Sequence, residues 1–166
     1  GMLEPDIKDK ELIRAVQTYL ALALDKLAEN CNNVCRWESS DQIIKSGVSK
    51  EGIKLTWDFA ELNPMARISG SFPLQIEAQV EAIRGLAVVD TCVACVRGTS
   101  TDLAFSDDAF DAIITDPPYY DNVSYSDLSD FFYVWIRRCL ENVYPEHLSM
   151  EQTPKRQEII VVPYRH

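Results

Sequence analysis

The sequence predicts an α/β fold in which helices alternate with the strands of a mostly parallel sheet. Long segments with apolar residues at every third or fourth position are typical of amphipathic helices. Between them lie short apolar runs bounded by turn-forming residues, which are typical of buried strands. Since no repeat, low-complexity segment or Gly/Ser-rich linker divides the chain, we expect a single domain over residues 2–166, with Gly1 as a tag remnant.

The N-terminal part of the chain predicts two helices. The first is expected over residues 7–29, ending at an Asn-rich stretch. Its apolar face is marked by Leu12, Val16, Tyr19, Ala23 and Leu27. Ser39 and Gln42 have the spacing of a capping box, which predicts a short helix reaching Lys45.

The middle of the chain predicts three strands around one helix. Alternating apolar residues over 53–59 predict the first strand. Pro73 suits the first turn of a helix that reaches Arg84. Apolar runs at residues 86–96 and 110–115 predict two further strands, and the second of these is expected to be central in the sheet.

The C-terminal part predicts the last clear helix, over residues 126–143, with Ser126 or Asp127 as its cap. Its apolar face, which we interpret as core, comprises Leu128, Phe131, Phe132, Trp135, Ile136, Cys139 and Leu140. The apolar run at residues 158–162 favours one more strand.

The tetrapeptide Asp116-Pro117-Pro118-Tyr119 directly follows the run at residues 110–115. Open α/β sheets bind ligands at the carboxyl ends of their strands, so the acid is expected in such a crevice. Proline fixes φ and has no N–H, which keeps the backbone rigid there. An Asp-Pro-Pro turn is also common at the ends of strands without any function, so the surrounding residues matter.

These residue types suit methylation of an exocyclic amino group on a nucleobase, a poor nucleophile because its lone pair is delocalised. The Asp116 carboxylate and the Pro117 carbonyl can accept hydrogen bonds from the amine, orient its lone pair and stabilise the developing positive charge. Tyr119 offers a flat face on which an unstacked base can lie, and stacking of this kind contributes about 1–3 kcal/mol per base. The base would be flipped out of a duplex or already single-stranded.

The tetrapeptide resembles the catalytic motif of S-adenosylmethionine-dependent amino-methyltransferases, which act on adenine N6 or cytosine N4 in DNA. The stretch 98–140 resembles large prokaryotic adenine-specific DNA methylases that carry an N-terminal domain of unknown function. The resemblance extends to residues 35–37, 57–64 and 163–166. It implies a partial Rossmann-like methyltransferase sheet with flanking helices, and a chain that is a segment of a longer enzyme.

The resemblance and the position of each residue suggest roles around the motif. The catalytic residues would be Asp116, Pro117, Pro118 and Tyr119. The residues expected to line the substrate side are Tyr120, Asp121, Asn122 and Tyr125. The resemblance also places a loop near the adenine ring of the cofactor, formed by Gly98, Thr99 and Ser100. These three residues can equally be a simple turn without a role in binding. Two alternatives stay open: a non-catalytic remnant or interaction domain, and methylation of RNA or of a protein amide.

The sequence departs from this family in its glycines. These enzymes bind S-adenosylmethionine with a glycine-rich turn between a strand and a helix. None of the 6 glycines of this chain forms such a turn, since Gly47 and Gly52 are well separated and Gly70 stands alone. We therefore expect the complete protein to supply the cofactor site. Whether adenine or cytosine is methylated, and in which sequence, is not encoded in any pattern that we find.

Composition limits the partners of the chain. It has 26 acidic and 16 basic residues and a net charge of -10, so weak or no DNA binding by this chain alone is expected. The pairs Arg137-Arg138 and Lys155-Arg156 are too few to form a basic patch. No apolar stretch approaches the ~20 residues of a transmembrane helix and no signal peptide is visible, so we expect a cytoplasmic protein without a membrane partner.

The 5 cysteines include two pairs with spacings that zinc sites use, Cys31 with Cys35 and Cys92 with Cys95. Cys92 and Cys95 lie in a segment predicted to be extended, where residues three apart point to opposite faces. We therefore expect no metal site and interpret these cysteines as buried structural thiols. A disulfide is disfavoured in a reducing cytoplasm.

Overall fold

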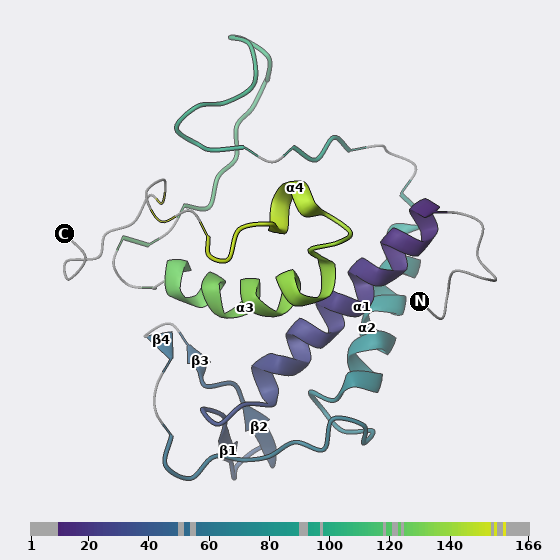
Figure 1. Cartoon of the computed structure of the whole chain (residues 1–166), viewed down its shortest axis with the longest axis vertical. Coiled ribbons are helices and arrows are strands. Elements are labelled where there is room, and N and C mark those ends of the chain that lie inside the picture. The colour runs from purple at the N-terminus through teal and green to yellow at the C-terminus, as the bar shows by residue number, and fades with distance from the viewer. Residues whose placement is uncertain are drawn as a thin grey trace.

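The structure is a computed structural model that describes residues 10–49, 52–53, 56–89, 93–96, 98–117, 119–120, 123, 125–153, 155 and 158. Its main elements are the helices α1 (Lys10–Asn30), α2 (Phe72–Leu86) and α3 (Tyr125–Leu140), followed by the single turn α4 (Pro145–Leu148). Helix α1 packs against both α3 and α2, and lies between them in space (Figure 1).

The strands form two small antiparallel hairpins. In the first, β1 (Arg36–Glu38) pairs with β2 (Ile43–Lys45), with Trp37 opposite Ile44. In the second, β3 (Val48–Ser49) pairs with β4 (Gly52–Ile53). The chain thus contains both helices and strands, and its described residues show no parallel sheet.

The helix predicted from Ser39 to Lys45 is wrong. Residues 39–42 form the turn that joins β1 to β2, with Gln42 at a φ of 53°. The hairpin is favoured because the β-branched Ile43 and Ile44 and the aromatic Trp37 suit a pleated surface, which outweighs a capping-box spacing.

The three predicted long helices are confirmed, with shifted ends. The predicted core face of α3 is only partly correct, since Leu140 is buried and Cys139 is exposed. Helix α2 has Pro73 in its first turn, as predicted, and continues to Leu86. Helix α3 begins at Tyr125, so Ser126 and Asp127 lie inside its first turn rather than at the cap. The first three residues of the predicted 7–29 helix lie outside the described part of the chain.

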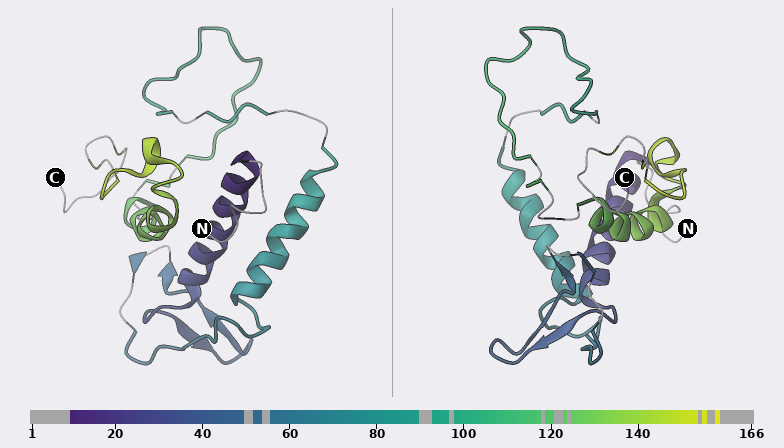
Figure 2. Two further views of the ribbon diagram at one scale, coloured as in Figure 1. Left: turned by 45° about the vertical axis from the view of Figure 1, so that its right-hand side comes forward. Right: turned by 90° about the vertical axis from the view of Figure 1, so that its left-hand side faces the viewer.

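The predicted central strands are wrong for the residues that are described. Leu86 ends α2, and residues 93–96 and 110–117 form no strand. Ile113 is 75% exposed and Ile114 is 95% exposed. The chain after α2 rises away from the helices as a long loop and then returns to α3 (Figure 2). A strand needs a neighbour for its backbone hydrogen bonds, and no described segment lies beside this one to provide it.

The outer predicted strands also change. Of the predicted strand 53–59, Ile53 belongs to a strand, residues 56–59 do not, and residues 54–55 lie outside the described part of the chain. Trp57 is 93% exposed. In the predicted strand 158–162, Glu158 is not in a strand and the remaining residues lie outside the described part of the chain.

The core is small and depends on α1. Ala21, Ala23, Leu27 and Ala28 are buried on this helix. Ala21 forms a buried cluster with Leu140 and Leu148, and the surrounding side chains are Tyr133, Ile136, Val143 and Tyr144. Of the predicted apolar face of α1, Ala23 and Leu27 are buried, whereas Leu12 is 50% exposed and Tyr19 is 41% exposed.

We predict that Gly47→Ala destabilises the chain. A Cβ at Gly47 would lie 1.9 Å from the carbonyl oxygen of Val34, a backbone atom that cannot turn aside. Unfolding in urea should show a loss of about 1–3 kcal/mol. The matched control is Gly85→Ala in α2, where a Cβ meets no atom within 4 Å and should stabilise the helix by about 0.5–1 kcal/mol. Equal effects of the two variants would contradict the described packing.

We predict that the charge on Asp25 weakens the fold at neutral pH. Burial and then the negative charge of Glu29 raise the pKa of Asp25 from 3.8 to about 6. Its Oδ1 is buried and has no hydrogen-bond partner among the described residues. A carboxyl group with a raised folded pKa contributes stability that is fully present below pH 3.8 and is lost as the pH rises through 6.

Asp25→Asn should therefore raise the free energy of unfolding at pH 7 by about 1 kcal/mol, since solvent screens a half-exposed group. The difference from the unsubstituted chain should vanish near pH 3. Urea unfolding at both pH values measures it, and a difference that is the same at both would contradict the assignment.

Candidate active-site segment

The motif segment, which we define as residues 110–119, lies on the long loop between α2 and α3. Asp116 and Pro117 are exposed, and the Tyr119 residue is 58% exposed. No described residue forms a hydrogen bond or ion pair with Asp116. The Asp116 carboxylate and the Tyr119 side chain are both exposed to solvent. Pro118 and the predicted substrate-side residues Asp121 and Asn122 lie outside the described part of the chain.

The chain changes direction directly after the motif. Tyr120 has a φ of 53°, in the left-handed region that non-glycine residues rarely occupy, and it is 74% exposed. Tyr125, the last predicted substrate-side residue, is the first residue of α3 and is 45% exposed. Two of the predicted substrate-side residues, Tyr120 and Tyr125, therefore lie at the two ends of the connection between the motif segment and α3.

The approach to the motif is held by an aromatic pair. The rings of Phe105 and Phe110 pack edge to face, with centroids 4.8 Å apart and planes at 78°. Between them, Asp108 has a φ of 59°, which reverses the chain. This contact orders the chain locally, just before the apolar run of the motif segment.

Residues 99–102 form a turn, closed by a hydrogen bond from the Asp102 N–H to the Thr99 carbonyl oxygen at 3.3 Å. Thr99 pairs with Asp102 in an isolated antiparallel bridge. The Thr99 hydroxyl accepts a hydrogen bond from the Thr101 N–H at 3.2 Å and lies 2.7 Å from the Thr101 hydroxyl. A Cβ added at Gly98 would meet nothing within 4 Å, so no close backbone approach requires glycine there.

These residues do not fit S-adenosylmethionine as a bound group. Gly98, Thr99 and Ser100 are exposed, and the Thr99 hydroxyl is already engaged within the turn. Two pockets among the described residues lie elsewhere and include no residue of the motif segment. The first, of about 340 Å³, is lined by Cys31, Asn32, Asn33, Phe59, Ala60, Glu61 and Leu62. The second, of about 420 Å³, is lined by Lys10, Ile13, Arg14, Gln17, Asn142 and Val143.

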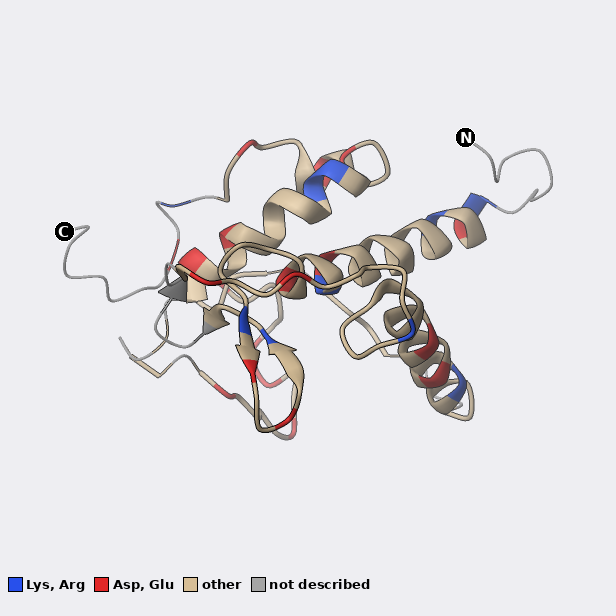
Figure 3. Ribbon diagram, turned by 90° about the horizontal axis from the view of Figure 1, so that it is seen from below, with Lys and Arg blue, Asp and Glu red and all other residues tan. Residues whose placement is uncertain are grey.

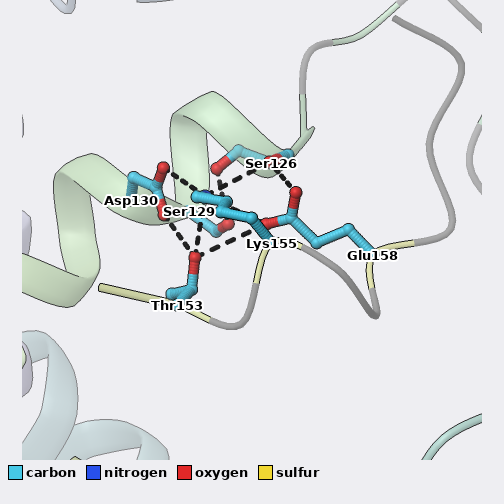
Figure 4. A network of polar contacts seen from close by, with 6 residues as sticks. All are labelled: Ser126, Ser129, Asp130, Thr153, Lys155 and Glu158. Atoms are coloured by element: carbon cyan, nitrogen blue, oxygen red, sulfur yellow. Dashed lines mark hydrogen bonds and ion pairs between the residues drawn. The ribbon is translucent and has the colours of Figure 1, made fainter. Parts of the chain in front are cut away.

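A cluster of polar side chains, which we call the Lys155 cluster, lies at the end of α3 that follows the motif (Figure 4). It comprises Ser126, Asp130, Thr153, Lys155 and Glu158. Lys155 donates hydrogen bonds to Thr153 at 2.8 Å and to Glu158 at 3.0 Å, and it pairs with Asp130. Ser126 donates to the other Glu158 oxygen at 2.7 Å, and Thr153 donates to Asp130 at 2.5 Å.

The charges in this cluster stabilise one another. Burial acts to lower the pKa of Lys155, but hydrogen bonds and charges from Asp130 and Glu158 outweigh it and raise that pKa. Burial acts to raise the pKa of Glu158, but hydrogen bonds from Ser126 and Lys155 outweigh it and lower that pKa. Lys155 therefore stays protonated at neutral pH and cannot act as a base. The stabilisation from Glu158 is present above pH 4.5 and is lost as the pH falls through its lowered pKa.

No sequence pattern predicts the Lys155 cluster, because its partners are far apart in the chain. Lys155 reads as a solvated surface residue, and Ser126 reads as a helix cap. The available signals are one-turn spacings: Ser126 and Asp130 share a face of α3, and Lys155 and Glu158 are three residues apart.

The charged side chains are dispersed over the molecule. Figure 3 shows the Lys and Arg positions scattered over several helices and strands, with acidic residues between them and no continuous basic face in the described part of the chain. None of the helices that the structure describes is long and apolar enough to cross a bilayer.

The cysteines only partly match the prediction of buried thiols. Cys35 is fully buried and its thiol contacts the carbonyl oxygen of Glu29 at 3.3 Å. Cys31 and Cys95 are exposed, which corrects the prediction for them, because neither packs into the helical core. Cys92 lies outside the described residues. Within the described ranges, no group of three or more His, Cys, Asp or Glu side chains is placed to hold a metal ion.

Comparison with known proteins gives no relative: no family model, no curated protein and no solved structure matches this chain. The resemblance of residues 116–119 and their surroundings to amino-methyltransferases stays a prediction, and we base a proposal about function on it.

Proposed function

We propose that this chain is the motif-bearing segment of an S-adenosylmethionine-dependent DNA methyltransferase that acts on adenine N6. The observation that carries the proposal is the sequence Asp116-Pro117-Pro118-Tyr119 at the end of an apolar run, with its carboxylate and its ring both free to meet a substrate. An acid committed to an internal ion pair, or a ring buried in the core, would have been incompatible with this role.

The proposed chemistry of this chain is orientation of the substrate amine. The Asp116 carboxylate and the Pro117 carbonyl accept hydrogen bonds from the amino group, which turns its lone pair toward the incoming methyl group. The same oxygens stabilise the positive charge that develops on nitrogen. Tyr119 stacks on the face of the extruded base. The cofactor, which the described residues do not hold, would be bound by other parts of the complete protein.

The exposure of the motif segment supports a sheet that is completed elsewhere. Phe110, Ile113 and Ile114 are 54%, 75% and 95% exposed, although their side chains suit a buried strand. Covering a large apolar side chain contributes about 1.5–3 kcal/mol. We propose that residues 110–115 become a strand of a Rossmann-like sheet whose neighbouring strands belong to the complete protein. A cytoplasmic location goes with this proposal. Because the basic residues of the described part of the chain are dispersed, we also propose that most DNA contacts lie outside this chain.

One alternative has an observation in its favour. The same exposed apolar residues suit a non-catalytic domain that binds a partner protein through residues 110–114. Under this alternative the carboxylate of Asp116 has no role in methyl transfer. A second alternative keeps the chemistry but replaces DNA by RNA or by a protein amide, since the motif requires only a planar amino group.

We predict that Asp116→Ala abolishes methyl transfer by the complete protein. Loss of an electrostatic contact made in the transition state should lower kcat at least about 100-fold. Transfer of a labelled methyl group to DNA measures it. The matched control is Asp111→Ala, which removes an exposed carboxylate from the same segment and should leave the rate within about twofold of the unsubstituted protein.

The same assay on matched DNA, RNA and peptide substrates separates the alternatives. Methyl transfer to adenine N6 in DNA would support the proposal. Transfer only to RNA or to a protein amide would keep the chemistry and identify that molecule as the substrate in place of DNA. Full activity in the Asp116→Ala protein would defeat the catalytic assignment, and no transfer to any substrate would favour the interaction domain.

A further inference from the structure

We infer that Lys155 is a positioning residue for the motif, because it ties the chain after α4 to the first turn of α3 and so fixes where the motif loop ends. This inference rests on the proposed function for its kinetic consequence. Its structural part concerns the Lys155 cluster alone and can be tested without any activity.

The first step is the closeness of the cluster to the motif along the chain. Helix α3 begins at Tyr125, six residues after Tyr119. A connection of this length spans at most about 20 Å, so the position of the helix start limits where the motif can lie. At the other end of the motif segment, the contact between Phe105 and Phe110 is local to the loop. The Lys155 cluster, at the start of α3, is therefore the constraint on the motif that involves residues distant in the sequence.

The second step is the burial of the cluster. Ser126 is only 8% exposed, and the side chains of Lys155, Asp130 and Glu158 are 33%, 35% and 16% exposed. Hydrogen bonds that involve a charged group are stronger than neutral ones, and partial burial reduces their screening by solvent. The cluster is therefore a stronger constraint than an ion pair on the surface, which contributes little.

The third step identifies Lys155 as the necessary member. It is the cation between two carboxylates, since it pairs with both Asp130 and Glu158. The charge of Asp130 acts on Glu158 to raise its pKa, which is the signature of repulsion between the two acids. Without the ammonium group the attraction that holds both acids to Lys155 is lost while their mutual repulsion remains, so we expect the two segments that carry the acids to be held less tightly.

The structural test is amide hydrogen exchange on the full chain. The amides of residues 129–131 donate to carbonyls of the first turn of α3, so they report whether that turn is held. Lys155→Met should accelerate their exchange about tenfold. Lys155→Arg, which keeps a cation able to pair with two carboxylates, should restore slow exchange.

The matched control is Arg67→Met. Arg67 donates to both oxygens of Glu77 at 2.6 and 3.1 Å, so this variant also removes a doubly bonded ion pair, at the start of α2. It should leave the exchange of residues 129–131 unchanged. Unchanged exchange in Lys155→Met would overturn the inference, whatever the activity of the complete protein.

The kinetic test uses the complete protein. Lys155→Met should lower kcat about tenfold while KM for S-adenosylmethionine stays the same, because the variant disturbs orientation of the amine and leaves the cofactor site intact. Lys155→Arg should recover most of kcat. Faster exchange with a normal kcat would overturn the positioning role and leave Lys155 as a purely structural residue. A complete protein that is inactive without any substitution would overturn the proposed function and the kinetic role together, while the exchange result would still decide what holds α3.

Discussion

The structure depends on the small side chains of α1. Ala21, Ala23 and Ala28 are buried on this helix, and they allow α3 and α2 to approach it from different sides. Larger residues at these positions would push both helices away, because interiors tolerate little added volume. Next to this contact, the hydroxyl groups of Thr18 and Tyr144 lie 3.0 Å apart, and the Arg14 guanidinium lies over the Tyr144 ring at 4.8 Å. Together these contacts fix α3 and the turn that follows it.

The packing of α1 against α2 and α3 orders the three long helices but does not extend to the motif segment, which is exposed. Helix α3 packs against α1 around Leu140, and the Lys155 cluster lies at its start. The chain between α2 and α3 has only local contacts in its described residues, such as the pair of Phe105 and Phe110. Helix α3 therefore begins close in the chain to an apolar segment that pairs with no strand among the described residues. Our proposal that the neighbouring strands belong to a larger protein accounts for this combination.

The sequence predicts those features that depend on local spacing. The helical periodicity of residues 7–29 and 126–143 and the proline at position 73 predict the three long helices, because an amphipathic face has a fixed period. The turn between Thr99 and Asp102 follows from its Thr, Ser and Asp content.

Features that depend on distant neighbours are not predictable in this way. The run at residues 110–115 has the composition of a strand, but a strand forms only where a second strand can pair with it. The β1–β2 hairpin replaces a predicted helix because Trp37 and Ile44 face each other across it. In the candidate site, the tetrapeptide is visible in the sequence, whereas the bond between Ser126 and Glu158 joins residues 32 positions apart and leaves no local pattern.

The most direct measurement of the central claim compares the motif segment in two contexts. Amide hydrogen exchange of residues 112–115 should be fast in this chain and slow in the complete protein with bound S-adenosylmethionine, since our proposal pairs the segment within a methyltransferase sheet there. We expect protection to rise at least about a hundredfold, the level of a buried strand. Equally fast exchange in both contexts would contradict the claim that residues 110–119 form the catalytic strand and motif of an enzyme.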